Sequence, residues 1–214
     1  MNHPLLHYLK QMPLVAILRG ITLAESLDVV ACLFEAGLRI VEVPLNSPDS
    51  LHSINLIAEK FSAQMLVGAG TVLNTEQVKN VAAAGGRLIV SPNTNEGVIQ
   101  SATALGMICI PGAATPSEVF TALEAGANGV KVFPAEMLSP TIIKSWRSVI
   151  PTSSIILPVG GISTDNMRDY WQAGANGFGI GSSLFQSGKS IEAISASAQK
   201  FVLALNELRL GRTN

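Results

Sequence analysis

The chain has 214 residues, with 14 Lys and Arg against 15 Asp and Glu and a formal net charge of −1. Because the two signs are interspersed, the chain offers no basic footprint for nucleic acid or for an anionic membrane. No linker, charge run or low-complexity tract divides the sequence, so we expect residues 1–214 to form a single domain. Charged residues are 14% of the chain, against about 25% in a typical soluble domain. This indicates either a surface covered by another subunit or a large core.

Two cysteines, Cys32 and Cys109, lie far apart in apolar segments, so we expect reduced core residues and a cytoplasmic protein. The N-terminus shows no leader pattern, and no apolar run is long enough to cross a bilayer. The few histidines fall away from the predicted strand ends. We therefore expect neither a catalytic metal nor a cofactor.

Short apolar segments alternate with amphipathic ones along the whole chain. We expect strands at about 14–18, 39–43, 65–69, 87–91, 107–110, 129–133, 154–159 and 176–180. Helices are expected to begin at Thr22, Ser50, Thr75, Pro116 and Thr164, and glycines follow several helical stretches as C-caps. The strands are apolar on both faces, as in parallel sheets covered by helices. Eight such units predict a (β/α)₈ TIM barrel, with an open doubly wound sheet as the alternative.

Polar residues and glycines collect where the predicted strands end. In chain order they are Arg19, Glu42, Thr71, Ser91-Pro92-Asn93, Pro111-Gly112, Lys131, Gly160-Gly161 and Gly181-Ser182. The carboxyl ends of the strands form the active site in (β/α)₈ barrels. The distribution therefore indicates a catalytic face at this end of the barrel.

Lys131 lies inside the apolar run 129–134, which we interpret as a buried strand. Period-two alternation places Lys131 and Phe133 on one face of the strand and Val130 and Val132 on the other. Burial lowers the pKa of a lysine, and the neutral amine is then a nucleophile for a Schiff base with a carbonyl substrate. The alternative is a structural lysine whose stem packs while its ammonium reaches solvent.

Glu42 lies inside the second apolar run, where burial raises the pKa of a carboxyl group and suits it to proton transfer. An ion pair with Lys131 or Arg19 is the structural alternative. Arg19 follows the first run, and its planar guanidinium suits a substrate carboxylate or phosphate, or else a salt bridge to Glu42. Thr71 either donates its hydroxyl to a substrate carboxylate or caps the helix that follows it.

Two glycine turns, at 159–162 and 179–183, follow the seventh and eighth predicted strands. Backbone N–H groups at these positions form the common phosphate site of (β/α)₈ barrels. We expect the second turn to open onto a short helix, whose N-terminus favours anions. The alternative is a pair of tight turns that need a positive φ.

Several of these motifs together resemble the class I 2-keto-3-deoxy-6-phosphogluconate and phosphogalactonate aldolases over essentially the whole chain. The matching motifs are 16–20 (AILRG), 42–47 (EVPLNS), 68–72 (GAGTV), 91–93 (SPN), 111–112 (PG), 131–134 (KVFP), 160–161 (GG) and 181–182 (GS). Their order and spacing make the resemblance specific.

The resemblance implies a role for each candidate residue. Lys131 would form the Schiff base and Glu42 would accept a proton. The implied substrate-binding residues are Arg19, Thr71, Pro92, Phe133 and Lys131 itself, and the implied phosphate-binding residues are Gly160, Gly161, Gly181 and Ser182. It further implies a homotrimer without metal or cofactor that produces pyruvate and glyceraldehyde 3-phosphate from a phosphorylated keto acid.

The sequence motifs do not agree on which of two C4 epimers is the substrate. Asn46-Ser47-Pro48 and Pro92-Asn93 resemble the phosphogalactonate branch, which favours 2-dehydro-3-deoxy-6-phospho-D-galactonate and a place in galactonate degradation, whereas Phe133–Glu136 resembles the phosphogluconate branch. Two other classes of function stay open on the residues alone. One is a sugar-phosphate isomerase or epimerase in which Lys131 acts by charge, and the other is a non-catalytic sugar-phosphate-binding barrel.

Overall fold

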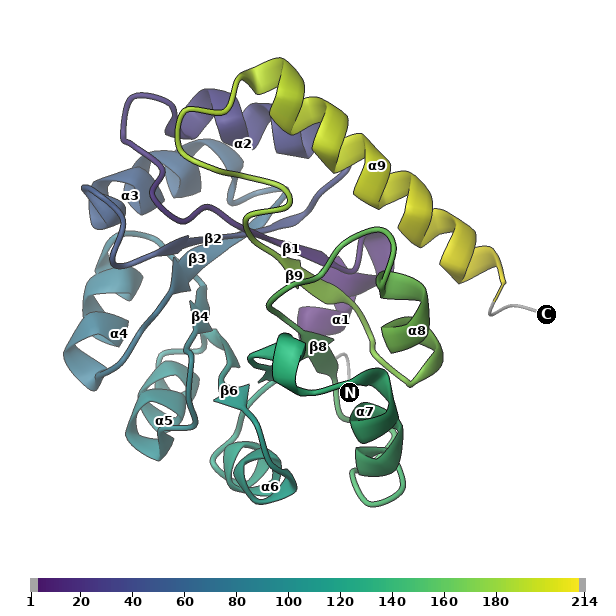
Figure 1. Ribbon diagram of the computed structural model, residues 1–214. Coiled ribbons are helices and arrows are strands. Elements are labelled where there is room, and N and C mark those ends of the chain that lie inside the picture. Colours follow the sequence, from purple (N-terminus) through teal and green to yellow (C-terminus); the bar gives the residue numbers. More distant parts are fainter. Residues whose placement is uncertain (1–3, 212–214) are drawn as a thin grey trace.

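The computed structural model describes residues 4–211 and shows parallel strands surrounded by helices (Figure 1). The strands are β1 (Leu14–Ile17), β2 (Ile40–Pro44), β3 (Leu66–Gly70), β4 (Leu88–Val90), β5 (Ile108–Ile110), β6 (Gly112–Ala113), β7 (Val130–Val132), β8 (Ile156–Pro158) and β9 (Phe178–Ile180). The helices are α1 (Pro4–Gln11), α2 (Ser26–Glu35), α3 (Ser50–Phe61), α4 (Thr75–Ala83), α5 (Glu96–Ala104), α6 (Pro116–Glu124), α7 (Pro140–Trp146), α8 (Met167–Gln172) and α9 (Ile191–Leu210). A 3₁₀ helix, η1 (Ala135–Met137), follows β7.

The strands pair in parallel within two sheets, of order β5-β4-β3-β2-β1-β9 and β6-β7-β8. The predicted parallel α/β architecture is confirmed, but the ladder has a break that the sequence analysis did not predict. The break falls at Pro111, between β5 and β6, and proline has no N–H to donate to a ladder. At the other side, Val159 after β8 forms a parallel bridge with Gly179 of β9.

All eight predicted strands are present, and no bound differs from the expected one by more than two residues. The helix starts at Ser50, Thr75 and Pro116 are confirmed, whereas those at Thr22 and Thr164 are wrong. The backbone N–H and the hydroxyl of Thr22 both donate to the Glu25 carboxylate, and the chain turns there before α2 begins at Ser26. Helix α8 likewise begins only at Met167.

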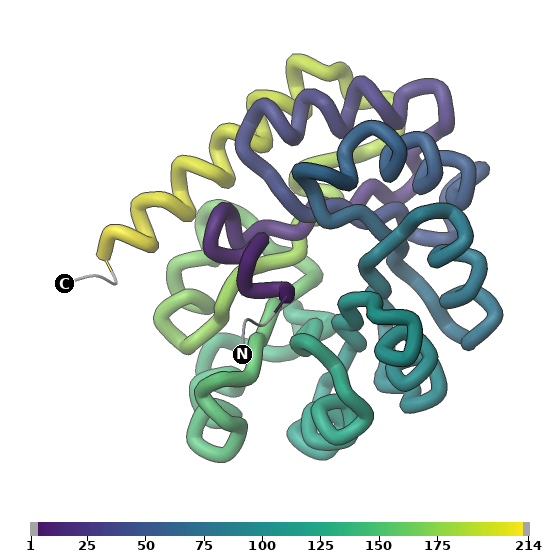
Figure 2. Tube along the Cα trace, turned by 180° about the vertical axis from the view of Figure 1, so that it is seen from behind, coloured from purple at the N-terminus to yellow at the C-terminus, as the bar shows by residue number. Residues whose placement is uncertain are grey.

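The two faces of the strands belong to different apolar cores. Residues such as Val41, Val130 and Val132 pack with the surrounding helices. The opposite face carries a second set, which we call the inner cluster: Leu5, Leu9, Val15, Ile40, Leu66, Leu88, Val90, Ile108, Ile110, Ile155 and Leu157. Its first two members come from α1, which the sequence analysis did not predict. Seen from behind, α1 lies across the strands (Figure 2).

Within residues 4–211, no helix is both long and apolar enough to span a membrane.

Candidate active site

Lys131 is the central residue of β7, and only 6% of its surface is exposed. As the alternation predicts, Val130 and Val132 face the helices, and Lys131 lies on the opposite face beside Leu157 of β8. Its Nζ lies 4.4 Å from the centre of the Phe133 ring. Burial lowers the pKa of Lys131, while the nearby Glu42 carboxylate acts in the opposite direction. With so little of its surface exposed, Lys131 does not extend to the outer surface as the structural alternative requires, and it lines the internal cavities instead.

Glu42 lies on β2 with 1% of its surface exposed, next to Ile17 of β1. Burial raises the pKa of its carboxyl group to about 7, although the positive charges of Lys131 and Arg19 favour the ionised form. Its Oε2 has no hydrogen-bond partner among the residues that the structure describes. Gly70 on β3 provides the space for this carboxylate, since a Cβ on that residue would overlap it.

Lys131 and Glu42 line one small apolar cavity together with Ile17, Val159 and Gly179. This cavity lies at the end of the inner cluster that is nearest the carboxyl ends of the strands. Removing two ionisable groups from solvent costs folding free energy, so their joint burial indicates a role other than stability. Opposite shifts in pKa, caused mainly by burial, bring both groups toward neutrality. Such a pair combines an amine whose unprotonated form is favoured by burial with a carboxyl group that exchanges protons near pH 7, which is typical of a catalytic site.

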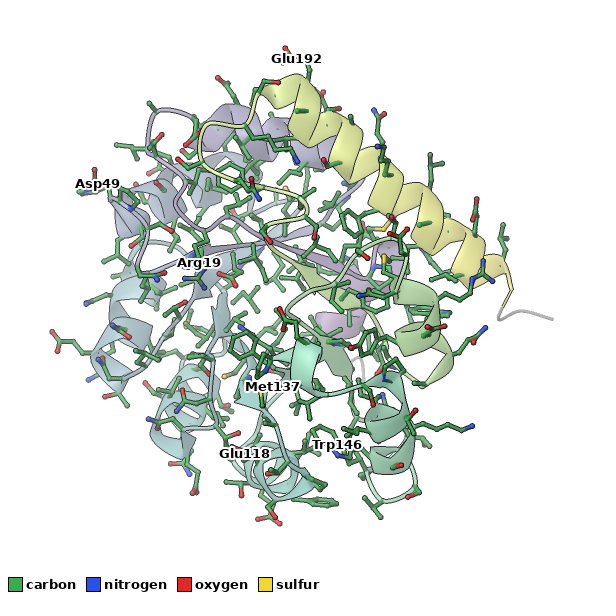
Figure 3. The ribbon with its side chains drawn as sticks, viewed as in Figure 1. Arg19, Asp49, Glu118, Met137, Trp146 and Glu192 are labelled. Atoms are coloured by element: carbon green, nitrogen blue, oxygen red, sulfur yellow. The ribbon has the colours of Figure 1, made fainter. Side chains whose placement is uncertain are left out.

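Arg19 is the second residue after β1 and is exposed at the carboxyl end of the strands (Figure 3). Its Nη1 donates to Asn46 Oδ1 at 2.7 Å and its Nη2 donates to Thr71 Oγ1 at 3.4 Å. Thr71 has a φ of 58° and does not cap the next helix, because the Asn74 side chain caps α4 by accepting from the Gln77 N–H. The structure thus joins Arg19 to Thr71 in one polar group.

A larger cavity of about 170 Å³ lies at the carboxyl ends of the strands, next to Arg19 and Lys131. Its walls come from four segments, at the ends of β1, β7, β8 and β9 and just beyond them. The lining residues are Ile17, Arg19, Lys131, Phe133, Glu136, Val159, Gly160, Gly161, Ile162, Gly179, Gly181, Ser182 and Ser183. The cavity therefore joins the Lys131 amine to both predicted phosphate turns. This contact between distant segments is what the rule on strand ends predicts.

The two glycine turns differ in conformation. Gly160 and Gly161 have φ values of 105° and 60°, so both need the left-handed region. Gly181 begins a turn in which the Leu184 N–H donates to its carbonyl. The expected short helix after this turn is wrong: residues 182–184 form a turn, and the next helix, α9, begins at Ile191.

Two predicted substrate-binding residues line neither cavity: Thr71, which only reaches the Arg19 guanidinium, and Pro92. The Pro92 carbonyl packs against Gly112, where a Cβ would overlap it. The described residues, 4–211, contain no group of three or more His, Cys, Asp or Glu side chains that could hold a metal ion.

Two residues beside the site were not predicted as part of it. Asn46 accepts the shorter of the two Arg19 hydrogen bonds, and Glu136 of η1 lines the larger cavity. Both follow the end of a strand by two to four residues, at the same face as the other polar residues. Applying the rule on strand ends to the whole of each following loop would have found them.

A desolvated lysine, a carboxyl group that titrates near neutrality and an open polar cavity together define an enzyme site suited to imine chemistry on a carbonyl compound. Comparison with known proteins identifies the family: the chain belongs to the KDPG and KHG aldolases, whose family model matches residues 5–198, and it is therefore a lyase.

Three relatives illustrate the similarity. The 2-dehydro-3-deoxy-6-phosphogalactonate aldolase of Escherichia coli (strain K12) is 44% identical over 92% of this chain and 96% of its own. A solved structure described as native KDPGal is 43% identical, with a TM-score of 0.92 over 94% of this chain and 97% of its own. The KDPG aldolase of Legionella pneumophila, solved with pyruvate captured as a covalent carbinolamine, is 26% identical, with a TM-score of 0.79 over 94% and 96%.

Proposed function

We propose that this enzyme cleaves 2-dehydro-3-deoxy-6-phospho-D-galactonate to pyruvate and D-glyceraldehyde 3-phosphate through a Schiff base on Lys131. The observation that carries the proposal is the burial of Lys131 and Glu42 together at the end of the inner cluster, beside an open cavity. The higher identity to the phosphogalactonate aldolase of E. coli (44%) than to its KHG/KDPG aldolase (33%) supports this epimer.

In the first half of the reaction, the neutral Lys131 amine attacks the C2 ketone of the keto acid. The resulting carbinolamine takes up one proton and loses water to give an iminium ion, whose positive nitrogen withdraws electrons from C3. The lowered pKa of Lys131 supports this step, because the unprotonated amine is the nucleophile.

In the second half, Glu42 takes the proton of the C4 hydroxyl, directly or through a water. The C3–C4 bond breaks, its electrons pass to the iminium to form an enamine, and the aldehyde product leaves. Protonation of the enamine at C3 and hydrolysis of the imine release pyruvate and restore the amine. A pKa of about 7 suits Glu42 to accept and return a proton in the same cycle.

The cavity suggests how the substrate is held. We assign its carboxylate end to Arg19 and Thr71, which are already joined by a hydrogen bond. Phe133 and Pro92 are assigned to the keto-acid portion, Phe133 from the cavity wall and Pro92 from the neighbouring loop. The phosphate is assigned to Gly160, Gly161, Gly181 and Ser182, which line the far side of the same cavity.

We propose that the two sheets together form a closed (β/α)₈ barrel within one domain of residues 1–214. The chain continuity of β5 and β6 across Pro111 and the bridge between Val159 and Gly179 support closure. We also propose a cytoplasmic homotrimer, as the family resemblance implies. Large apolar side chains that remain exposed, including Leu105 and Val149, support an assembly of subunits.

The test is to supply the purified protein with each C4 epimer and measure pyruvate release. We expect a higher kcat/KM on the galactonate epimer. Release of pyruvate only from the gluconate epimer would reverse the substrate assignment, in agreement with the Phe133–Glu136 motif. Release from neither epimer would contradict the proposed reaction as a whole.

A further inference from the structure

The Glu136 carboxylate lies directly against the first glycine turn. A Cβ built on Gly160 would overlap Glu136 Oε2, and one built on Gly161 would lie 2.7 Å from Glu136 Cγ. Glu136 also lines the cavity that contains both glycine turns and Lys131. An acidic side chain thus occupies the wall of the cavity at the place to which the phosphate is assigned.

The backbone that carries Glu136 is held in place from two sides. The Ala135 N–H donates to the Val159 carbonyl at 2.9 Å, and the Tyr170 hydroxyl donates to the Ala135 carbonyl at 2.8 Å. Tyr170 is a buried residue of α8. The start of η1 is therefore fixed against the end of β8, while the side chain of Glu136 is exposed and lies against the glycine turn.

A carboxylate at this place opposes every anion that enters the turn. Like charges at short range disfavour each other, and the effect is largest where solvent is partly excluded. Repulsive groups are one of the two ways in which a site rejects unwanted ligands. The opposition acts equally on a free phosphate ion and on the phosphate group of a substrate, so it cannot by itself favour the substrate.

The substrate differs because it is also held at a second point. A ligand that is bound covalently to Lys131 presents its phosphate to the turn at a high effective concentration. The bond to Lys131 offsets the repulsion for such a ligand, whereas a free ion has no second attachment to offset it. After the C3–C4 bond breaks, the phosphorylated aldehyde loses this second attachment and meets the full repulsion.

We propose that Glu136 weakens the binding of every phosphate group at the glycine turn, so that a ligand stays there only while it is also attached at Lys131 and the phosphorylated aldehyde leaves readily once the C3–C4 bond breaks. Inorganic phosphate and the phosphorylated aldehyde product are the two ligands that lack this second attachment. This inference rests on the proposed function, because it needs both the Schiff base at Lys131 and the phosphate site at the turn.

The test compares the wild-type enzyme with Glu136→Gln, which keeps the shape of the side chain and removes its charge. Inorganic phosphate is titrated as a competitive inhibitor of cleavage at constant ionic strength, and glyceraldehyde 3-phosphate is titrated as a second probe. We expect Glu136→Gln to lower the inhibition constants of both probes on the order of tenfold, and KM to fall in the same direction. Glu96→Gln is the matched control, since Glu96 is an exposed residue in the first turn of α5 and does not line the cavity.

The rate of imine formation with pyruvate separates the two levels of the argument, because pyruvate has no phosphate. Unchanged inhibition constants in Glu136→Gln, with normal imine formation, would overturn this inference and leave the proposed function standing. A rise in KM without tighter inhibition would also overturn it, and would make Glu136 an attractive contact for substrate hydroxyls. Failure of the wild-type protein to form the imine would overturn the proposed function and this inference with it.

Discussion

The two ends of the inner cluster are built in opposite ways. At the amino ends of the strands, Leu5 and Leu9 of α1 close the cluster with apolar side chains, and Leu5 packs beside Gly129. At the carboxyl ends, Lys131 and Glu42 place two ionisable groups in the same buried face, under an open cavity. One end therefore contributes mainly to folding, while the other places poorly solvated charges where they are useful for chemistry.

Replacing the amine at the carboxyl end has the largest expected effect. Lys131→Met should lower kcat/KM by about 10⁴-fold or more, because the nucleophile is lost. The free energy of unfolding should stay the same or rise, since a desolvated amine is replaced by an apolar side chain of similar length. Lys144→Met, on the surface of α7, is the control and should keep both activity and stability. A large loss of stability in Lys131→Met would remove the contrast between the two ends.

The opposite end should respond in stability and not in activity. Leu5 is fully buried, so Leu5→Ala should lower the free energy of unfolding by about 2–5 kcal/mol. In the folded fraction, kcat/KM should stay within about twofold of wild type, because the change lies far from the cavity. Denaturant unfolding measures the first quantity, with Leu203→Ala, on the exposed surface of α9, as the control. A matching fall in kcat/KM would show that the two ends are coupled.

The charge on Glu42 makes stability depend on pH. Its pKa is about 7 in the folded protein and about 4.5 when exposed, so the folded state binds more protons between these values. Stability from the protonated group is complete below pH 4.5 and is lost as pH rises toward 7, by up to about 3 kcal/mol. Glu42→Gln should remove this slope, keep imine formation and lose most cleavage. An exposed change of the same kind, Glu59→Gln, should keep the wild-type slope.

Retained wild-type turnover in Glu42→Gln would exclude Glu42 as the base. An unchanged pH slope in the same variant would show that another group titrates in this range.

The smallest effect concerns the orientation of Arg19. Its hydrogen bond to Asn46 is exposed, so its loss should cost about 1 kcal/mol. Asn46→Ala should therefore raise KM about fivefold and change kcat by less than about twofold. The reason is that binding of the substrate carboxylate weakens to the same extent in the ground state and in the transition state. Steady-state kinetics test this, with Asn80→Ala on the exposed face of α4 as the control. An equal fall in kcat would show that Asn46 contacts the reacting atoms.

The sequence predicts the alternation of strands and helices well, because apolar runs and glycine caps are local signals. It does not predict α1, whose only signal is the spacing of Leu5 and Leu9 in eight residues, nor the separate strand β6 beyond Pro111. Helix starts are less reliable where local hydrogen bonds compete, as between Thr22 and Glu25. Side chains that hydrogen-bond to nearby backbone often form turns in place of a first helical turn.

The site likewise contains residues that the sequence predicts and contacts that it does not. Lys131 and Glu42 are visible in the sequence, because a charge inside an apolar run conflicts with its surroundings. The hydrogen bond from Arg19 to Asn46 and the contact of Glu136 with Gly160 are not visible, since they join loops that only tertiary structure brings together. Those contacts are the ones to which we assign the orientation of Arg19 and the weakening of phosphate binding.

The most direct test of the account is to incubate the protein with pyruvate and borohydride and to map the product by mass spectrometry. We predict one reduced pyruvate adduct, on the peptide that contains Lys131, with none on the peptide that contains Lys144 and none in Lys131→Met. An intact protein that gives no adduct, or an adduct on another lysine, would contradict the central role of the buried amine.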